Sequence, residues 1–149
     1  MNVFKTTALL TLMTLIVLFT AQVLGFDLIV SLFFAFIFNF IMYFYSGKLA
    51  LASTKAKKIE EGQYQDVVGI ITFLTQKEKM PMPELYVIEN DQPNAFATGR
   101  NPKNASVAVT TGIIKVLTRD ELEGVLAHEL SHIKNRDILV SSIAAMLAA

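Results

Sequence analysis

Both histidines of this 149-residue chain, His128 and His132, lie four residues apart, with Glu129 directly after the first. On a helix, residues four apart are separated by about 40° around the axis, so the two imidazoles project side by side and can bind one metal ion. Glu129 points about 100° away from His128, beside such an ion rather than onto it. The spacing predicts His128 and His132 as metal ligands and Glu129 as the catalytic acid and base.

Zinc is the predicted ion, one per chain, because the chain has no cysteine and a tetrahedral site of histidine and carboxylate ligands suits zinc. A zinc site with an open position activates water, and Glu129 would pass the proton of that water to the leaving amine of a cleaved peptide. The alternative is two unrelated surface histidines. With 2 His and 8 Glu in the chain, a random arrangement gives this pattern with a probability on the order of 0.001.

A catalytic zinc site needs a third protein ligand, and the sequence offers no clear one. Four carboxylates lie on or next to the same helix, with no loop to return them to the metal: Asp120, Glu121, Glu123 and Asp137. Three others are topologically free to approach, but nothing favours them: Glu60, Glu61 and Glu89. We therefore expect these 149 residues alone to bind zinc weakly and to cleave poorly.

The helix that would carry the histidines begins with a capping box. Thr118 is followed three residues later by Glu121, and Asp120 adds negative charge where the helix dipole favours it. The apolar face of this helix is broad enough to bury and consists of Leu122, Val125, Leu126 and Leu130. The predicted site therefore lies on a helix that is anchored by packing.

The preceding segments predict an α+β domain. Residues 66–80 have the apolar spacing of an amphipathic helix, with Val67, Ile70, Ile71 and Leu74 on one face. Residues 84–89 are rich in β-branched and aromatic side chains, which favours a strand. The segments 94–99 and 105–110 are strand-like and flank a turn-rich connection, which predicts a β-hairpin. We expect residues 53–62, which are rich in lysine, to form a short helix.

The first 47 residues differ sharply in composition from the rest. Of the 26 charged residues, only Lys5 and Asp27 lie there. Residues 6–24 and 28–45 are uncharged and largely apolar, and a short turn lies between them. Each segment is long enough to cross a hydrocarbon core of about 30 Å. They predict an antiparallel transmembrane hairpin; a cleaved signal peptide is the alternative for the first segment.

The basic residues predict the orientation of this hairpin. Lys5 precedes the first span, and four lysines follow the second: Lys48, Lys55, Lys57 and Lys58. Under the positive-inside rule both ends face the cytoplasm. We divide the chain into the hairpin at 1–47, a cytoplasmic domain at 48–137, and the start of a further transmembrane helix at 138–149. A net charge of zero excludes a strongly basic surface, so we expect no nucleic-acid partner.

The whole chain resembles the HtpX group of membrane-bound zinc metalloproteases, relatives of the CAAX prenyl endopeptidases. The resemblance rests on the hairpin, on residues 94–114 (NAFATGRNPKNASVAVTTGII) and on residues 128–137 (HELSHIKNRD). It implies a zincin-like metalloprotease domain, incomplete here, after the transmembrane hairpin. It also implies a multi-pass protein of the bacterial inner membrane, with its site facing the cytoplasm, that degrades misfolded or damaged membrane proteins.

The same resemblance assigns roles to particular residues. It makes His128 and His132 zinc ligands and Glu129 the catalytic acid and base, with the third ligand a glutamate on a later helix, beyond Ala149. Asn94 and Ala95 match a pair that binds substrate backbone from a strand edge; an ordinary turn is the alternative. Asp137 would orient an imidazole from outside the ligand set, or is simply a surface aspartate.

The sequence therefore predicts a zinc-dependent endopeptidase of the bacterial inner membrane, whose partners are membrane-protein substrates and the lipid bilayer. A catalytically inactive membrane adaptor, or a truncated protease homologue, is the alternative from another class. A serine hydrolase is disfavoured, because the chain has no G-x-S-x-G motif and one helix carries both histidines.

Overall fold

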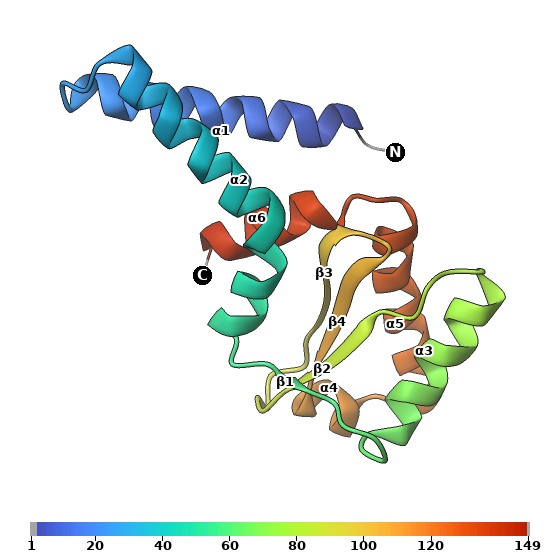
Figure 1. Ribbon diagram of the computed structural model, residues 1–149. Coiled ribbons are helices and arrows are strands. Elements are labelled where there is room, and N and C mark those ends of the chain that lie inside the picture. Colours follow the sequence, from blue (N-terminus) through green and yellow to red (C-terminus); the bar gives the residue numbers. More distant parts are fainter. Residues whose placement is uncertain (1–2, 149) are drawn as a thin grey trace.

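The structure is a computed structural model that describes residues 3–148. Two long helices lead into a four-stranded sheet with four further helices, and Figure 1 shows the two long helices extending away from the rest. The elements are α1 (Val3–Val23), α2 (Leu28–Ser53), β1 (Lys57–Lys58), α3 (Gln65–Lys77), β2 (Glu84–Ile88), β3 (Ala95–Asn101), β4 (Asn104–Thr110), α4 (Thr111–Val116), α5 (Arg119–Lys134) and α6 (Ile138–Ala148).

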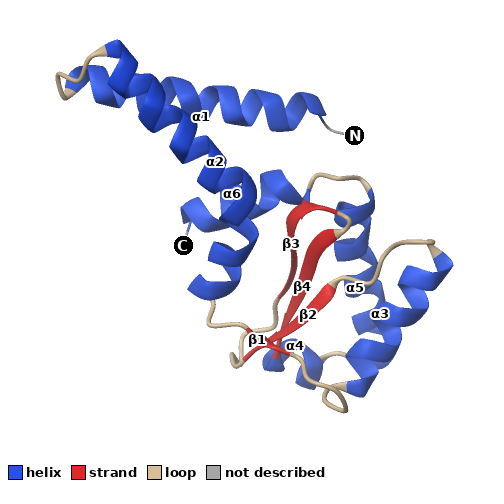
Figure 2. Cartoon of the chain, viewed as in Figure 1, coloured by secondary structure: helices blue, strands red, loops and turns tan. Residues whose placement is uncertain are grey.

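The sheet has the order β1-β2-β4-β3, so β3 lies at an edge. β2 and β4 are parallel, whereas β1 pairs with β2 and β3 pairs with β4 in the antiparallel sense. Figure 2 shows the sheet with helices on both sides. The predicted hairpin of β3 and β4 is confirmed, as are the amphipathic helix α3, the strand β2 and the α5 capping box.

One face of the sheet packs against α3 and α5. The apolar face predicted for α3 is buried throughout, and on α5 Leu122, Leu126 and Leu130 are buried with it, whereas Val125 is only partly buried. The strands contribute small and β-branched residues to this core, chiefly Ala97, Val107 and Val109. Together these contacts fix the helix that carries the histidines against the sheet.

The second face of the sheet is covered by the end of α2. Leu51 packs there with Ile88 of β2 and Ala108 of β4. The helix continues to Ser53, six residues past the boundary that we predicted at residue 47, because burial of Ala50 and Leu51 against the sheet stabilises its last turns. The long second helix therefore belongs to both parts of the molecule.

The predicted short helix at residues 53–62 is wrong. The chain turns at Lys55, which has a left-handed backbone with φ of 54°, and Lys57–Lys58 then form β1 against β2. Exposed Lys57 and Lys58 also contact Glu89 and Glu84, each at 2.7 Å. Pairing with β2 satisfies backbone groups that an isolated lysine-rich helix would have to satisfy alone.

The first two helices have the surface of membrane-spanning segments. Both are long and apolar enough to cross a membrane, and only 11% and 17% of their most apolar windows are buried within the protein. Large side chains such as Phe19 and Phe36 are 72% and 70% exposed. Asn39 links the two helices through a 2.7 Å hydrogen bond from its Nδ2 to Thr14 Oγ1. These features fit a membrane protein, since water disfavours so large an apolar surface.

Candidate metal centre

The histidines lie near the C-terminal end of α5, whose start is held by the capping box. Glu121 N donates to Thr118 Oγ1 at 3.4 Å, and Thr118 N donates to Glu121 Oε2 at 2.8 Å. The hydrogen bonds that Glu121 Oε2 accepts from the backbone N–H and from the hydroxyl of Thr118 hold the pKa of Glu121 below its usual value, because they favour the charged carboxylate. At the other end, an ion pair between Lys134 and Glu78 joins α5 to the end of α3 and lowers the pKa of Glu78.

The two imidazoles face each other. The Nε2 atoms of His128 and His132 are 3.3 Å apart, and the ring planes are inclined at 86°. Two nitrogens that are each about 2.0–2.1 Å from one tetrahedral zinc ion lie about 3.3–3.4 Å apart. The separation therefore fits shared coordination of one zinc ion, with Nε2 as the ligand atom of each ring.

Asp137 contacts one of these rings. Its Oδ1 lies 3.1 Å from Nδ1 of His132. An ionised carboxylate only accepts hydrogen bonds, so a neutral His132 ring that carries its proton on Nδ1 would donate to Asp137 and leave a lone pair on Nε2, the atom that approaches His128. The chain reaches this geometry by turning after α5, where Asp137 N donates to His132 O at 3.2 Å.

Glu129 contacts the edge strand of the sheet. Its Oε2 accepts a 3.1 Å hydrogen bond from the backbone N–H of Ala97, thirty-two residues earlier in the chain. A cavity of about 240 Å³ lies here between β3, α5 and α6, lined by Glu129, His132 and Ala97 among others. The carboxylate predicted to act as acid and base is thus held next to the strand predicted to bind substrate.

The hydrogen-bonding register of β3 decides which backbone groups face outward. Asn94 O accepts from Thr110 N of β4 at 2.9 Å, so the backbone of Asn94 faces into the sheet. In an antiparallel ladder alternate residues face opposite sides, so Ala95 and Ala97 direct their N–H and C=O groups to the outer edge. Of the predicted pair, Ala95 therefore presents backbone at the edge, and Asn94 presents only its exposed side chain.

The outer edge of β3 is closed at its far end by α6. Ser142 Oγ accepts from Gly99 N at 2.9 Å and lies 2.6 Å from Thr98 Oγ1. This buried serine uses the backbone groups that a further strand would need at that position. The edge next to Glu129 is accordingly limited to the segment before Gly99.

Sequence reasoning missed Ala97 and Ser142. The alternation of a strand could have identified Ala97, because it lies two residues after Ala95 and faces the same edge. No comparable signal identifies Ser142, a small polar residue within an apolar helix.

Within residues 3–148, no carboxylate joins the two histidines as a potential third ligand. The carboxylates considered from the sequence thus do not complete the site in the described part of the chain.

Comparison with known proteins places this arrangement in a family. The pattern of peptidase family M48 matches residues 60–149, which include β3, the whole of α5 and the turn to Asp137. The chain belongs to peptidase family M48. It is 46% identical to a protein named Protease HtpX homolog from Thermodesulfovibrio yellowstonii, over 99% of this chain and 53% of that protein.

Other relatives agree with this membership. A Protease HtpX homolog from Thermococcus sibiricus is 44% identical over 97% of this chain and 50% of its own length. The chain therefore spans about half the length of the curated relatives it matches. The crystal structure of Ste24p from S. mikatae has a TM-score of 0.54 and 19% identity, over 98% of this chain and 36% of that one. That likeness shows a common fold. Together with the family match, the two apolar helices followed by a mixed α/β domain fit a zincin-like fold.

Proposed function

We propose that this protein is a zinc-dependent endopeptidase, in which His128 and His132 hold the metal and Glu129 is the acid and base. The observation that carries the proposal is the position of Glu129, which is next to a pair of facing imidazoles and hydrogen-bonded to the edge strand β3. Membership of a peptidase family and the names of the relatives support the same activity.

The chemistry divides between the metal and the side chains. His128 and His132 would hold a zinc ion through Nε2, and that ion would act as a Lewis acid toward the scissile carbonyl and make water acidic enough to lose a proton near neutral pH. Glu129 takes that proton and delivers it to the nitrogen of the leaving amine. The Ala97 N–H holds one carboxylate oxygen, and the other is left to handle the proton. Asp137 keeps His132 in the tautomer that can bind metal.

An extended substrate would bind along the outer edge of β3. Backbone groups of Ala95 face that edge, and the side chain of Asn94 lies at its beginning, so a peptide added as a further strand would pass Glu129. Recognition through backbone hydrogen bonds depends little on side-chain identity. This supports our proposal that the substrates are misfolded or damaged membrane proteins of varied sequence.

We further propose that the protein is a multi-pass protein of the bacterial inner membrane with its catalytic domain in the cytoplasm. The lysines that flank the two spans support this orientation, because basic residues are concentrated on the cytoplasmic side of membrane helices. The lipid bilayer and its embedded proteins are then the partners, and no nucleic acid is involved.

The decisive test is Glu129→Gln in the full protein in detergent, with casein as the substrate. We expect cleavage to fall by about 10²–10⁴-fold, because the amide cannot take the proton, while zinc content stays unchanged. Glu123→Gln is the matched control, since Glu123 lies on the same helix outside the site. Undiminished cleavage by Glu129→Gln would disprove the mechanism. Wild-type protein that binds no zinc and cuts nothing would favour a membrane adaptor.

The third zinc ligand is a separate proposal. We propose a glutamate from a part of the protein outside these 149 residues, in line with the absence of a third ligand among residues 3–148 and with the greater length of the relatives. Zinc affinity, measured by competition with a chromogenic chelator, should then be much weaker for the 149-residue chain than for the full protein. Equal, tight, stoichiometric binding by both would refute it.

A further inference from the structure

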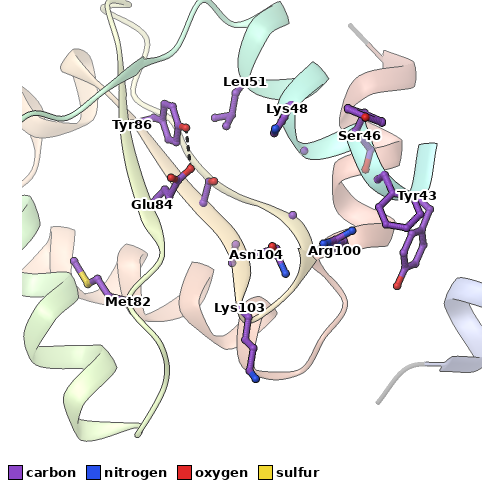
Figure 3. Close-up of a pocket in the computed structure, with 16 residues that line it drawn as sticks. Tyr43, Ser46, Lys48, Leu51, Met82, Glu84, Tyr86, Arg100, Lys103 and Asn104 are labelled. Carbon is purple, nitrogen blue, oxygen red and sulfur yellow. Dashed lines mark hydrogen bonds between the residues drawn. The ribbon is translucent and has the colours of Figure 1, made fainter. Parts of the chain in front are cut away.

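A second cavity, of about 460 Å³, lies away from the histidines, between the end of α2 and the β3–β4 hairpin. Figure 3 shows its lining: Lys48 comes from α2, Arg100 and Asn104 from the facing hairpin, and Lys103 from the turn between the two strands. No residue of this cavity takes part in the chemistry proposed above. The cavity therefore needs its own explanation.

The cavity lies at the depth where a membrane meets water. Lys48 is twenty residues beyond Leu28, the first residue of α2, which corresponds to about 30 Å of helix and to the thickness of a hydrocarbon core. Tyr45, three residues before Lys48, is 48% exposed. Tyrosine side chains are typical of the headgroup level of a membrane. The opening of the cavity would therefore face lipid headgroups.

The charges around the cavity favour an anion. Among the described residues, Lys48, Arg100 and Lys103 form no ion pair with a carboxylate. The one acidic residue in the lining, Glu84, is already engaged by Lys58 at 2.7 Å and by the Tyr86 hydroxyl at 3.0 Å. Three cations thus line the cavity, against one carboxylate that is ion-paired with Lys58, a residue outside the lining.

The position of Arg100 is fixed by the backbone. The pairing of β3 with β4 is irregular between Gly99 and Asn101, and such a bulge redirects the intervening side chain. Gly99 has φ of 135°, and a Cβ there would lie 2.2 Å from Asn104 O, so only glycine fits. The guanidinium of Arg100 lies over the ring of Phe44, 4.8 Å from its centroid. It is held at the membrane end of the cavity.

We propose that this cavity binds the phosphate of an anionic phospholipid, with Lys48 and Arg100 as its main contacts and the acyl chains along the exposed aromatic face of α2. Basic residues immediately on the cytoplasmic side of a transmembrane span are known to attract anionic lipid headgroups. The proposal rests on α1 and α2 crossing a membrane, as proposed above, and is independent of peptidase activity.

The test measures lipid binding to the full protein in neutral detergent by native mass spectrometry, with phosphatidylglycerol and phosphatidylcholine of the same acyl chains. We expect wild type to prefer phosphatidylglycerol. The double variant Lys48→Gln, Arg100→Gln should weaken phosphatidylglycerol binding by about 25-fold, because removal of each cation should weaken it about fivefold. The control, Lys5→Gln with Lys55→Gln, removes two other membrane-flanking cations and should have little effect. Arg100→Lys, which keeps the charge, should retain most of the affinity.

The outcomes separate the possible sources of the phosphate. Equal losses in the cavity variant and the control would overturn the site in favour of diffuse attraction. Complete displacement of the lipid by inorganic phosphate would overturn the lipid assignment in favour of a free phosphate ligand. A circular dichroism melt of each variant shows that it is folded. Glu129→Gln should bind lipid as wild type does, so a failure of the proposed peptidase function would not be mistaken for a failure of this one.

Discussion

Asp137 and Glu129 show how single hydrogen bonds prepare the site. Asp137 Oδ1 lies 3.1 Å from Nδ1 of His132, and the Ala97 N–H donates to one oxygen of Glu129. Neither partner lies within the helical turn from His128 to His132. The four-residue spacing brings two imidazoles together, and residues outside that turn contact the His132 ring and the Glu129 carboxylate.

Replacing Asp137 by alanine should lower the zinc affinity of the full protein by about 10–100-fold, because the His132 ring loses the acceptor that holds its tautomer and orientation. Competition with a chromogenic chelator measures this affinity. Asp120→Ala is the matched control, since Asp120 is an exposed aspartate at the start of the same helix. If Asp137→Ala binds zinc as tightly as wild type does, the carboxylate has no part in preparing the ring.

At the level of elements, α5 depends on its ends as well as on its buried face. The helix contains similar numbers of apolar and polar residues. The capping box defines where it begins, and the burial of Leu126 and Leu130 defines which side faces the sheet. Edge strand β3 is the second element that shapes the site. Of its outward backbone groups, the N–H of Ala97 donates to Glu129 and the N–H of Gly99 donates to Ser142.

The capping box predicts a pH dependence. Because the pKa of Glu121 is lower in the folded protein than its ordinary value of 4.5, its contribution to stability is present above pH 4.5 and is lost as the pH falls through the folded pKa. Glu121→Ala should therefore lower the Tm at neutral pH, and the difference from wild type should shrink in acid below pH 4.5. Circular dichroism melts across this range test it.

Glu123→Ala serves as the control for that experiment, because it removes the same charge two residues nearer the middle of α5, outside the capping box. Its Tm should differ little from that of wild type at any pH. A difference between Glu121→Ala and wild type that persists undiminished in acid would show that the charge of Glu121 does not support the helix.

On the scale of the whole molecule, α2 extends from the apolar hairpin into the α/β domain. Its last turns pack on the sheet, and Gly47 lies against Gly99 at the bulge of β3. A Cβ on Gly47 would be 3.1 Å from Gly99 Cα and 3.2 Å from Gly99 N. The membrane helix thus reaches the same strand that carries the proposed substrate edge.

Gly47→Val should destabilise this junction by about 1–3 kcal/mol, because its Cβ would already be tightly placed against the Gly99 backbone and its two γ carbons add further bulk there. A lower Tm and reduced casein cleavage by the full protein are the expected results. Gly69→Val is the control, since a Cβ on this α3 glycine meets nothing within 4 Å. A wild-type Tm and wild-type cleavage in Gly47→Val would mean that close packing of α2 on β3 is unnecessary.

The sequence by itself determined the features that depend on local pattern. Apolar runs without charge indicated two long helices, and periodicity identified α3, the strands and the face of α5. The spacing of His128 and His132 on one helix placed their imidazoles together, because helical geometry alone sets that distance. Where a competing long-range partner existed, local reasoning failed, as at β1, where pairing with β2 outweighed the helix-forming tendency of lysine.

Only the tertiary structure decided which distant groups meet these local elements. The hydrogen bond from Ala97 to Glu129, the closure of the β3 edge by Ser142, the packing of α2 on the sheet and the basic cavity beside Arg100 all join residues far apart in the chain. Such contacts depend on sheet order and on the register of each strand, since a shift of one residue turns every backbone group of β3 to the other side. Alternation along β3 indicates which of its residues share an edge, but it does not say which residues of α5 and α6 meet that edge.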